Sequence, residues 1–578
     1  MTRHVMLLLL LLTTTCARAG APTPTGPAAP PIELDATVRA LSLRDRAAQL
    51  VWPWIPGTYA PYHDETYSRT VARWVDSLHV GGVLISVGGP LDVAAKLNDL
   101  QRRSPLPLLV AADLESGAAF RLSGATATPP NMGVAATGRE QDAYEIARIT
   151  AHEGRAVGIH LSFAPVADVN DNPANPVINI RSFGEDPAAV ARLVGAAVRG
   201  LEGNGMAGTA KHFPGHGDTD TDTHVALPTI SAGWSRLASV ELVPFRAAIA
   251  AGVTGVMSAH IAVPALDDGR VRPATTVPAI LTGVLRDSLG FTGVVFTDAL
   301  NMGGLASVGS PGDVAVAALL AGADVLVQPA DPAVAIDAVT AAVADGRLPE
   351  ARLDASVRRV LALKARFGLF QRRTVPLDSV PSVVGAPAFQ ATADSIAGRS
   401  LVLVRDRDRL VERLRTRTER IALVTYGDDR SPQVGQVLAA ALRDRGHSVS
   451  LTRLWPASGP ASYDSARAAI AGGSVALFAV AARPLPWDAA RLTLPEAMAR
   501  LLETTAARQA TVLVSLGSPY ILRQAPGVGT YLLAWLANPA MERAVAGALD
   551  AAAISGRLPI RIPPDLPLGG GLMVPARR

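Results

Sequence analysis

Short apolar runs alternate with longer segments of helical period through residues 32–370, which is the pattern of a parallel sheet built from β-α units. Segments 188–201 and 313–321 show the helical spacing of apolar residues well. Eight repeats predict a (β/α)8 TIM-type barrel, whose active site lies at the carboxyl ends of its strands. The predicted strands are 48–52, 80–86, 106–113, 160–168, 208–213, 255–260, 293–298 and 324–328.

A second series of β-α repeats follows the barrel. Residues 371–390 carry several prolines and no clear period, which is typical of a linker. Residues 391–565 are predicted to form a smaller three-layer α/β sandwich domain. Residues 566–578, which include three consecutive glycines, are expected to form a loose tail. The strands predicted in the second domain are 401–404, 421–425, 476–480, 511–516 and 531–534.

The N-terminal residues carry the pattern of an exported chain. A basic start, an apolar run over 5–12 and a small-residue cleavage site indicate a signal peptide over 1–19, followed by a flexible Pro/Ala-rich lead over 20–31. The apolar run is much shorter than the about 20 residues that cross a bilayer, so no transmembrane segment is expected. The sequence predicts a periplasmic or extracellular protein, with a lipoprotein-type anchor at Cys16 as the less favoured alternative.

Composition narrows the classes of function. The 578 residues are 49% hydrophobic and 18% charged, and the net charge is +4, or +2 without Arg3 and Arg18 of the predicted leader. This balance excludes a disordered protein and gives no sign of nucleic-acid binding. The only cysteine is Cys16, so the exported chain is expected to have no disulfide and no thiolate chemistry. The glycine pattern at 203–208 precedes a strand instead of following one, so no nucleotide cofactor is expected.

The densest group of chemically active residues follows the fifth predicted strand. From Lys211 to His224 the chain reads KHFPGHGDTDTDTH, with three of its ten histidines. An Asp two residues before a His orients and charges the imidazole for acid–base chemistry, and Asp222 and His224 have that spacing. A solvated loop is one alternative, and zinc on His212, His216 and His224 is another. The intervals between these histidines fit neither an HExxH helix nor a zinc finger, so no metal is expected.

Polar residues also follow other predicted strands. Asp298 comes directly after an apolar run, where a barrel strand opens to the active-site mouth, and is a candidate nucleophile or base. Its structural alternative is the N-cap of a following helix. Asp113, Arg121 and Arg181 also follow predicted strands. Acidic and basic groups gathered at one mouth suit a polyhydroxylated ligand, because each hydroxyl both donates and accepts.

Several of these motifs together resemble one known family. They are Lys-His-Phe-Pro-Gly-His-Gly at 211–217 with Asp222-Thr223-His224, Arg181-Ser182-Phe183, Met257-Ser258-Ala259-His260, Gly-Val-Val-Phe-Thr-Asp at 293–298 and Ser-Leu-Gly-Ser-Pro-Tyr at 515–520. In them the chain resembles glycoside hydrolase family 3, specifically its β-N-acetylglucosaminidase (β-hexosaminidase) branch. The family usually has Asp-Gln-Glu-Gly-Gly where this chain has Asp113-Leu114-Glu115-Ser116-Gly117.

The resemblance implies a function and roles for the residues. Asp298 is the implied nucleophile and His224 the implied acid/base, with Asp222 paired to its imidazole. The implied reaction is a retaining exo-hydrolysis that releases N-acetylglucosamine from cell-wall or chitin-derived oligosaccharides, without a cofactor. The implied ligands of the non-reducing sugar are Asp113, Arg121, Arg181, Lys211 and His212.

Related activities stay open at this stage. A histidine acid/base presents no second anion to the incoming acceptor, so phosphate could replace water and make the enzyme a phosphorylase. A non-catalytic sugar-binding protein is disfavoured because Asp298 and His224 are both present. A family 3 β-glucosidase or β-xylosidase would take its acid/base Glu from the second domain, where the candidates are Glu412, Glu419, Glu496, Glu503 and Glu542.

Overall fold

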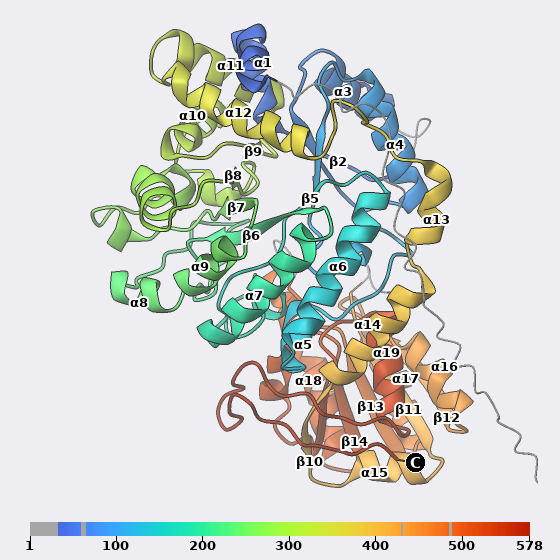
Figure 1. Cartoon of the computed structure of the whole chain (residues 1–578). Helices are drawn as coiled ribbons and strands as arrows, with labels where there is room; N and C mark the ends of the chain where they lie inside the picture. The colour runs from blue at the N-terminus through green and yellow to red at the C-terminus, as the bar shows by residue number, and fades with distance from the viewer. Residues whose placement is uncertain (1–32, 59–64, 429–431, 485–487, 578) are drawn as a thin grey trace, which may run out of the picture.

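The computed structural model describes residues 33–58, 65–428, 432–484 and 488–577. The predicted leader at 1–19, with Cys16, and the predicted lead at 20–31 lie outside these ranges. Figure 1 shows the barrel in the upper part of the view and the second domain below it. The predicted α/β class and the order of the two domains are therefore confirmed.

Parallel strands form a closed barrel, as the sequence predicts. The strands β2 to β8 pair in chain order, and β1 pairs with β9. A bridge between Phe296 of β8 and Val325 beside β9 joins the two sets. The barrel strands are β1 (Val51–Trp52), β2 (Trp54–Ile55), β3 (Gly82–Ile85), β4 (Leu109–Ala112), β5 (Leu161–Ser162), β6 (Ala207–Phe213), β7 (Gly255–Ser258), β8 (Val294–Thr297) and β9 (Leu326–Val327).

Two observed barrel strands differ clearly from the predicted ones. Of the first predicted strand, 48–52, only Val51–Trp52 forms β1, because α2 extends to Gln49, and β2 follows Pro53 beyond the predicted range. The strand predicted over 160–168 keeps only β5, because Pro165 follows closely and cannot donate to the ladder. Both predicted runs are buried and mostly apolar, so hydrophobicity alone does not reveal these limits.

Aromatic side chains fill the interior of the barrel. The ring of Phe296 lies 5.4 Å from the rings of Trp52 and Phe163, edge to face with both. All three side chains are buried. Because side chains alternate along a strand, Asp298 lies on the same side as Phe296, two residues nearer the carboxyl end. The packed core thus ends below the mouth, where Asp298 lies.

Helices surround the barrel. Asp186 caps α7 through its bond to the Ala189 amide, and Ser310 and Asp313 form a capping box that begins α10. The helices around the sheet are α1 (Leu34–Ala40), α2 (Leu43–Gln49), α3 (Glu65–Asp76), α4 (Pro90–Arg103), α5 (Asn131–Ala136), α6 (Glu140–Ala156), α7 (Pro187–Glu202), α8 (Trp234–Ser239), α9 (Leu242–Ala250), a π-helix at Ala279–Ser288, α10 (Pro311–Ala321), α11 (Pro332–Ala344) and α12 (Glu350–Arg366).

Buried Asp324 joins the sheet to α12 and to the π-helix. One carboxylate oxygen accepts from Arg286 at 2.6 Å and from the Val295 amide at 3.0 Å. The other accepts from Ser356 at 2.6 Å and from Arg359 at 3.0 Å. The Asp324 side chain has no exposed area, so it balances guanidinium charge inside the barrel wall.

We expect Asp324→Asn to lower the free energy of unfolding by about 3 kcal/mol, because it leaves partly buried guanidinium groups without their fully buried counter-charge. Urea unfolding followed by circular dichroism measures the change. Asp337→Asn is the control: this aspartate pairs with Arg44 on the surface, and its side chain is 61% exposed. Exposed pairs contribute about 0–1 kcal/mol, so equal losses in the two variants would contradict the role given to Asp324.

The second domain is built on a six-stranded sheet with the order β10-β15-β14-β13-β11-β12. Its strands are parallel except β10, which is antiparallel to β15. The five predicted strands are confirmed, whereas β12 was not predicted. The strand β12 lies at the sheet edge with most of its side chains partly or fully exposed, so it has no apolar run. The elements are α14 (Pro387–Ser400), β10 (Val402–Asp406), α15 (Leu410–Thr416), β11 (Arg420–Tyr426), α16 (Gln436–Asp444), β12 (Ser448–Leu454), α17 (Pro460–Gly472), β13 (Val475–Val480), α18 (Glu496–Ala506), β14 (Thr511–Ser515), β15 (Thr530–Leu533) and α19 (Pro539–Ala548).

The segments before and after the second domain have more structure than the sequence indicates. Residues 371–390 include the short helix α13 (Val380–Val383) and the first residues of α14. The prediction of a loose tail over 566–578 is wrong at two residues that pair with the second domain. The Leu572 amide donates to the Leu403 carbonyl at 2.7 Å, and Val574 pairs with Ile554. The reason is that β10 lies at the sheet edge and has backbone groups to satisfy.

The second domain also contacts the loop that follows β5. Side-chain nitrogens of Asn170 and Asn179 lie 3.4 Å from the hydroxyls of Tyr520 and Ser518, respectively. Further along this loop, Glu185 pairs with Arg561 at 2.7 Å. The second domain therefore packs against the segment that carries Arg181.

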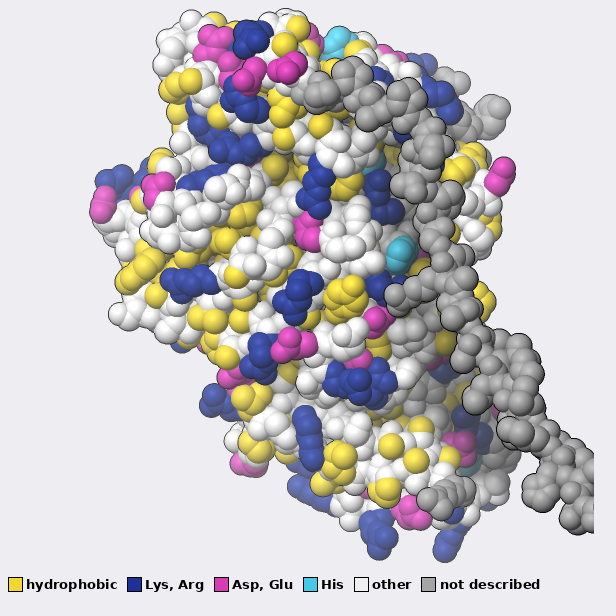
Figure 2. All heavy atoms as spheres, viewed as in Figure 1, with side chains coloured by type: hydrophobic (Ala, Val, Ile, Leu, Met, Phe, Trp, Pro, Cys, Tyr) yellow, Lys and Arg dark blue, Asp and Glu magenta, His cyan; other side chains and the backbone are white. Residues whose placement is uncertain are grey.

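Charged side chains are mixed on the molecular surface. On the face seen in Figure 2, the described Lys and Arg side chains form separate groups among acidic, apolar and uncharged ones. Within the described ranges, none of the helices combines the length and the apolar character that crossing a membrane requires.

Candidate active site

Asp298 follows β8 at the mouth of the barrel, where the sequence predicts it. Its backbone amide donates to the Ser258 carbonyl at 3.1 Å, and its Oδ1 accepts from the Ala299 amide at 2.8 Å. No α-helix begins here, because the next described element is a 3₁₀ turn capped by Met302. The N-cap alternative for Asp298 is therefore wrong.

Charges around Asp298 keep its carboxylate ionised. Burial raises the pKa of Asp298, but electrostatic interactions with His212, His260 and Lys211, together with the bond from the next backbone amide, lower the pKa by more than burial raises it. Its pKa therefore lies below the usual value of an aspartate. An ionised carboxylate at the mouth of a barrel has the chemistry of a nucleophile.

Asp222 and His224 form the pair that their spacing predicts. Oδ1 of Asp222 accepts from Nδ1 of His224 at 2.7 Å and from the His224 backbone amide at 2.9 Å. The Asp222 side chain is 8% exposed and the His224 side chain 20% exposed. With Nδ1 bound to the carboxylate, the imidazole supports proton exchange at Nε2.

Two glycines join the loop of this pair to the loop of Asp298. The Gly303 amide donates to the His224 carbonyl at 3.2 Å, and the Gly304 amide donates to the Thr223 carbonyl at 3.0 Å. A Cβ atom on Gly303 would lie 2.8 Å from the His224 carbonyl oxygen, so a larger residue does not fit without movement. The structure thus brings the two predicted catalytic loops into direct contact.

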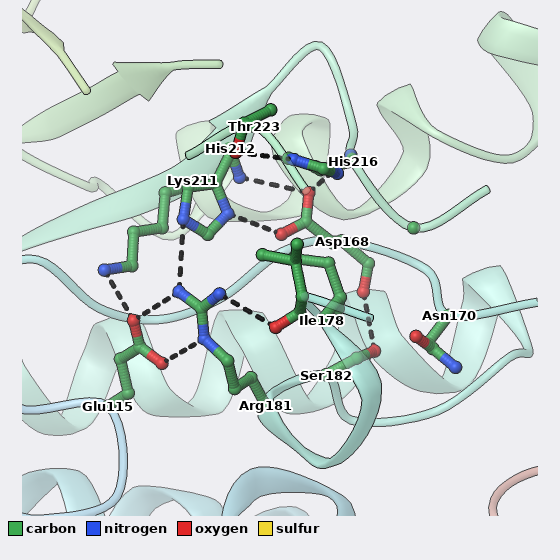
Figure 3. Close-up of polar contacts among 12 residues, drawn as sticks. Glu115, Asp168, Asn170, Ile178, Arg181, Ser182, Lys211, His212, His216 and Thr223 are labelled. Carbon is green, nitrogen blue, oxygen red and sulfur yellow. Dashed lines mark hydrogen bonds and ion pairs between the residues drawn. The ribbon is translucent and has the colours of Figure 1, made fainter. Parts of the chain in front are cut away.

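Glu115 lies at the centre of the predicted sugar-binding residues. It accepts from Nε and Nη2 of Arg181, both at 2.8 Å, and from Nζ of Lys211 at 2.6 Å. Figure 3 shows these three side chains beside His212. Burial raises the pKa of Glu115, but the charges of Arg181 and Lys211 hold it well below its usual value. The bidentate ion pair fixes the guanidinium in one orientation.

Asp113 and Arg121 extend this network. Oδ1 of Asp113 accepts from Lys211 at 2.8 Å, and Oδ2 accepts from Arg121 at 2.9 Å. The change to Leu114 in this segment is accommodated because Leu114 is buried in the hydrophobic core. All five residues predicted to bind the sugar therefore lie in one connected network, with His212 3.3 Å from Arg181.

The ion pairs of Asp113 predict a pH dependence of stability. Burial raises its pKa, but Lys211 and Arg121 lower the pKa of Asp113 to about 2. The unfolded value is about 3.9, so the stabilisation is complete above about pH 4 and is lost as the pH falls towards 2. We expect the difference in free energy of unfolding between the wild type and Asp113→Asn to shrink over that interval. Urea titrations at several pH values measure it, and a constant difference would contradict the shift.

Asp168 is a site residue that sequence reasoning missed. It is buried, and its carboxylate accepts from Nδ1 of His212 at 2.7 Å and from the amides of His212 at 3.1 Å and His216 at 2.7 Å. Nε2 of His212 faces the Arg181 guanidinium, which can only donate, so Nδ1 carries the proton. Asp168 ends a predicted strand, and the signal that selected Asp113 and Asp298 could have selected it too.

The histidines considered for zinc have other partners. Nδ1 and Nε2 of His216 lie 2.7 Å from the Thr219 hydroxyl and 3.3 Å from the Thr223 hydroxyl, and burial lowers the pKa of His216 to about 4. His212 and His224 each contact an aspartate through Nδ1. In the described part of the chain, no group of three or more His, Cys, Asp or Glu side chains is arranged to hold a metal ion.

Acidic side chains of the second domain mostly have partners within that domain. Glu419 pairs with Arg413 at 2.7 Å, and Glu496 pairs with Arg500. Backbone amides donate to Glu503 at 3.0 Å and to Glu542 at 2.9 Å. These contacts give no support to a borrowed acid/base glutamate.

Comparisons with known proteins agree with this site. Residues 42–363 match the glycosyl hydrolase family 3 N terminal domain. A beta-N-acetylglucosaminidase/beta-glucosidase of Cellulomonas fimi is 35% identical over 66% of this chain and 70% of its own length. A beta-hexosaminidase A of Pseudoalteromonas piscicida is 35% identical over 56% of this chain and 57% of its own length.

A solved structure extends the similarity to both domains. The family 3 beta-N-acetylglucosaminidase of Paenibacillus sp. str. FPU-7 superposes with a TM-score of 0.81 at 32% identity, covering 90% of this chain and 99% of that one. The family match includes the segments of Asp113, Lys211, His224 and Asp298. This chain therefore belongs to glycosyl hydrolase family 3.

Proposed function

We propose that the protein is an exported, retaining exo-β-N-acetylglucosaminidase in which Asp298 is the nucleophile and His224 the acid/base. The observation that carries the proposal is the Asp222–His224 pair, bonded at 2.7 Å, on a loop that Gly303 and Gly304 join to the loop of Asp298. The barrel itself supplies both groups, which makes a glutamate from the second domain unnecessary.

The reaction divides into two displacements. In the first, a carboxylate oxygen of Asp298 bonds to the anomeric carbon while His224 gives its proton to the departing glycosidic oxygen. In the second, neutral His224 takes a proton from water as the water oxygen displaces Asp298 from the anomeric carbon. Two inversions return the β configuration, and both side chains recover their starting charge.

The charged network beside Asp298 suits the terminal sugar. Carboxylate oxygens of Asp113 accept from sugar hydroxyls, and Arg121, Lys211 and His212 supply donors. Arg181 is held by Glu115 in a fixed orientation, which limits how the sugar can bind. The relatives named for N-acetylglucosaminidase or hexosaminidase activity favour an N-acetyl sugar at this position.

The substrate context follows from the predicted leader. An exported enzyme of this chemistry meets N-acetylglucosamine as the terminal sugar of cell-wall or chitin fragments. We infer that such oligosaccharides are its substrates, outside the cytoplasm. The phosphorylase alternative rests on His224, since an acid/base without negative charge does not repel phosphate at the second step.

Initial rates on aryl β-N-acetylglucosaminide and aryl β-glucoside, with and without phosphate, test the proposal. We expect kcat/KM for the N-acetyl sugar to exceed that for glucose by at least about 10-fold, with free N-acetylglucosamine as product. Equal or reversed preference would contradict the assigned substrate and favour a β-glucosidase. A sugar phosphate formed only when phosphate is present would change the assignment to a phosphorylase.

A further inference from the structure

His260 lies directly beneath the loop that carries Asp298. It follows β7, has no exposed area, and its Nε2 lies 3.0 Å from the Ala299 carbonyl oxygen. Its Nδ1 lies 2.8 Å from the Thr275 hydroxyl. Because a carbonyl oxygen only accepts, Nε2 carries the proton and Nδ1 accepts from Thr275. The two bonds fix both the tautomer and the orientation of this ring.

Ala299 connects that ring to the nucleophile. Its amide donates to Oδ1 of Asp298 at 2.8 Å, while its carbonyl accepts from His260. The residue that orients the Asp298 carboxylate is thus itself held by the imidazole. A shift of the Ala299 backbone would move the amide that holds Asp298 and turn the carboxylate away from the anomeric carbon.

The same histidine supports the loop of the acid/base. A Cβ atom on Gly304 would lie 3.2 Å from Cβ of His260 and 3.2 Å from the Thr223 carbonyl oxygen. The Gly304 backbone is therefore packed between His260 and the residue that precedes His224. Its amide donates to Thr223 at 3.0 Å, so a displacement of His260 reaches both catalytic loops.

We propose that His260 is a positioning residue that sets the relative placement of Asp298 and His224, through Ala299 on one side and Gly304 on the other. This inference rests on the proposed roles of the two catalytic residues. Electrostatic coupling agrees with the geometry. Burial lowers the pKa of His260, while Asp298 raises it and His224 lowers it, so the ring lies within the field of both groups.

Kinetics of His260→Met and His260→Gln test the inference, on whichever aryl β-N-acetylglucosaminide or aryl β-glucoside the wild type hydrolyses. Met fills the space without a donor, whereas Gln offers an amide donor to the Ala299 carbonyl. We expect kcat of His260→Met to fall about 30- to 100-fold with KM changed less than threefold, since small misplacements of reacting groups cost about that much. The Gln variant should recover to within about fivefold of the wild-type kcat.

His160→Met is the matched control. His160 is also a buried histidine of the barrel, directly before β5, and its Nδ1 accepts from the Val110 amide of β4. Both Met variants should lose thermal stability, but only His260→Met should lose kcat selectively. Gly304→Ala tests the second contact independently, and we expect it to lower kcat at least about 10-fold because its Cβ would push the loops apart.

The outcomes separate this inference from the proposed function. A wild type that prefers the β-glucoside contradicts the assigned substrate. The kcat values of the His260 variants on the β-glucoside then test the role of His260. A His260→Met kcat within threefold of the wild type, or a Gln variant no better than the Met variant, overturns the inference. If His260→Met does not fold, Gly304→Ala decides, and a wild-type kcat in that variant would overturn the inference.

Discussion

Asp298→Ala is expected to lower kcat/KM on aryl β-N-acetylglucosaminide by at least about 10⁴-fold, because it removes the atom that bonds to the anomeric carbon. The substitution should slow the chemical step and leave the folded structure intact. Among the residues that the structure describes, the adjacent amide is the one hydrogen-bond donor to the Asp298 carboxylate, so removing the carboxylate breaks no ion pair of the sugar-binding network. The melting temperature should therefore stay close to that of the wild type.

Adding azide to Asp298→Ala tests whether Asp298 is the nucleophile, because azide can replace the missing carboxylate as the attacking group. In Asp298→Ala the space left by the carboxylate admits azide, which displaces an activated leaving group in a single inversion. The expected product is the α-glycosyl azide, identified by proton NMR. Asp268→Ala is the control, since the side chain of Asp268 is 89% exposed on the surface. Activity near the wild-type level in Asp298→Ala, or a β-azide product, would remove Asp298 as the nucleophile.

The sequence locates the barrel and its catalytic segments through local signals. Apolar runs identify the strands, and polar residues at their carboxyl ends, such as Asp113 and Asp298, identify the mouth. The missed features depend on contacts between distant segments. Glu115 meets Arg181 across 66 residues of chain, and no local pattern shows that Glu115 is the centre of the network. His260 belongs to a motif quoted for its resemblance, but its bond to Ala299 appears only in the fold.

Errors in the predicted elements have simple physical causes. Hydrophobicity shows that the segment before Asp168 is buried, but Pro165 prevents the strand from reaching it. The strand β12 is exposed at an edge and therefore lacks an apolar run. The expected tail pairs with Leu403 because an edge strand leaves backbone groups to be filled, and composition alone does not show which segment fills them.

His224→Ala is expected to have effects that depend on the leaving group. For a disaccharide of N-acetylglucosamine, whose leaving group must be protonated, kcat/KM should fall about 10³-fold. For 2,4-dinitrophenyl β-N-acetylglucosaminide, which departs without a proton, kcat/KM should change less than about 10-fold, while kcat falls because the second step loses its base. Asp222→Asn should show the same selectivity to a smaller degree, since Asp222 holds and charges the imidazole.

Another His–Asp pair of the same barrel, remote from the site, provides the control. Nδ1 of His79 lies 2.8 Å from Oδ1 of Asp45, close to the 2.7 Å of the His224 pair, but His79 precedes β3 at the amino-terminal end of the strands. His79→Ala should leave kcat/KM unchanged for both substrates.

Azide added to His224→Ala should accelerate turnover of the dinitrophenyl substrate and give the β-glycosyl azide, because azide attacks the glycosyl-Asp298 intermediate. Equal losses on both substrates, or an α-azide, would remove His224 as the acid/base and reopen the search for that group.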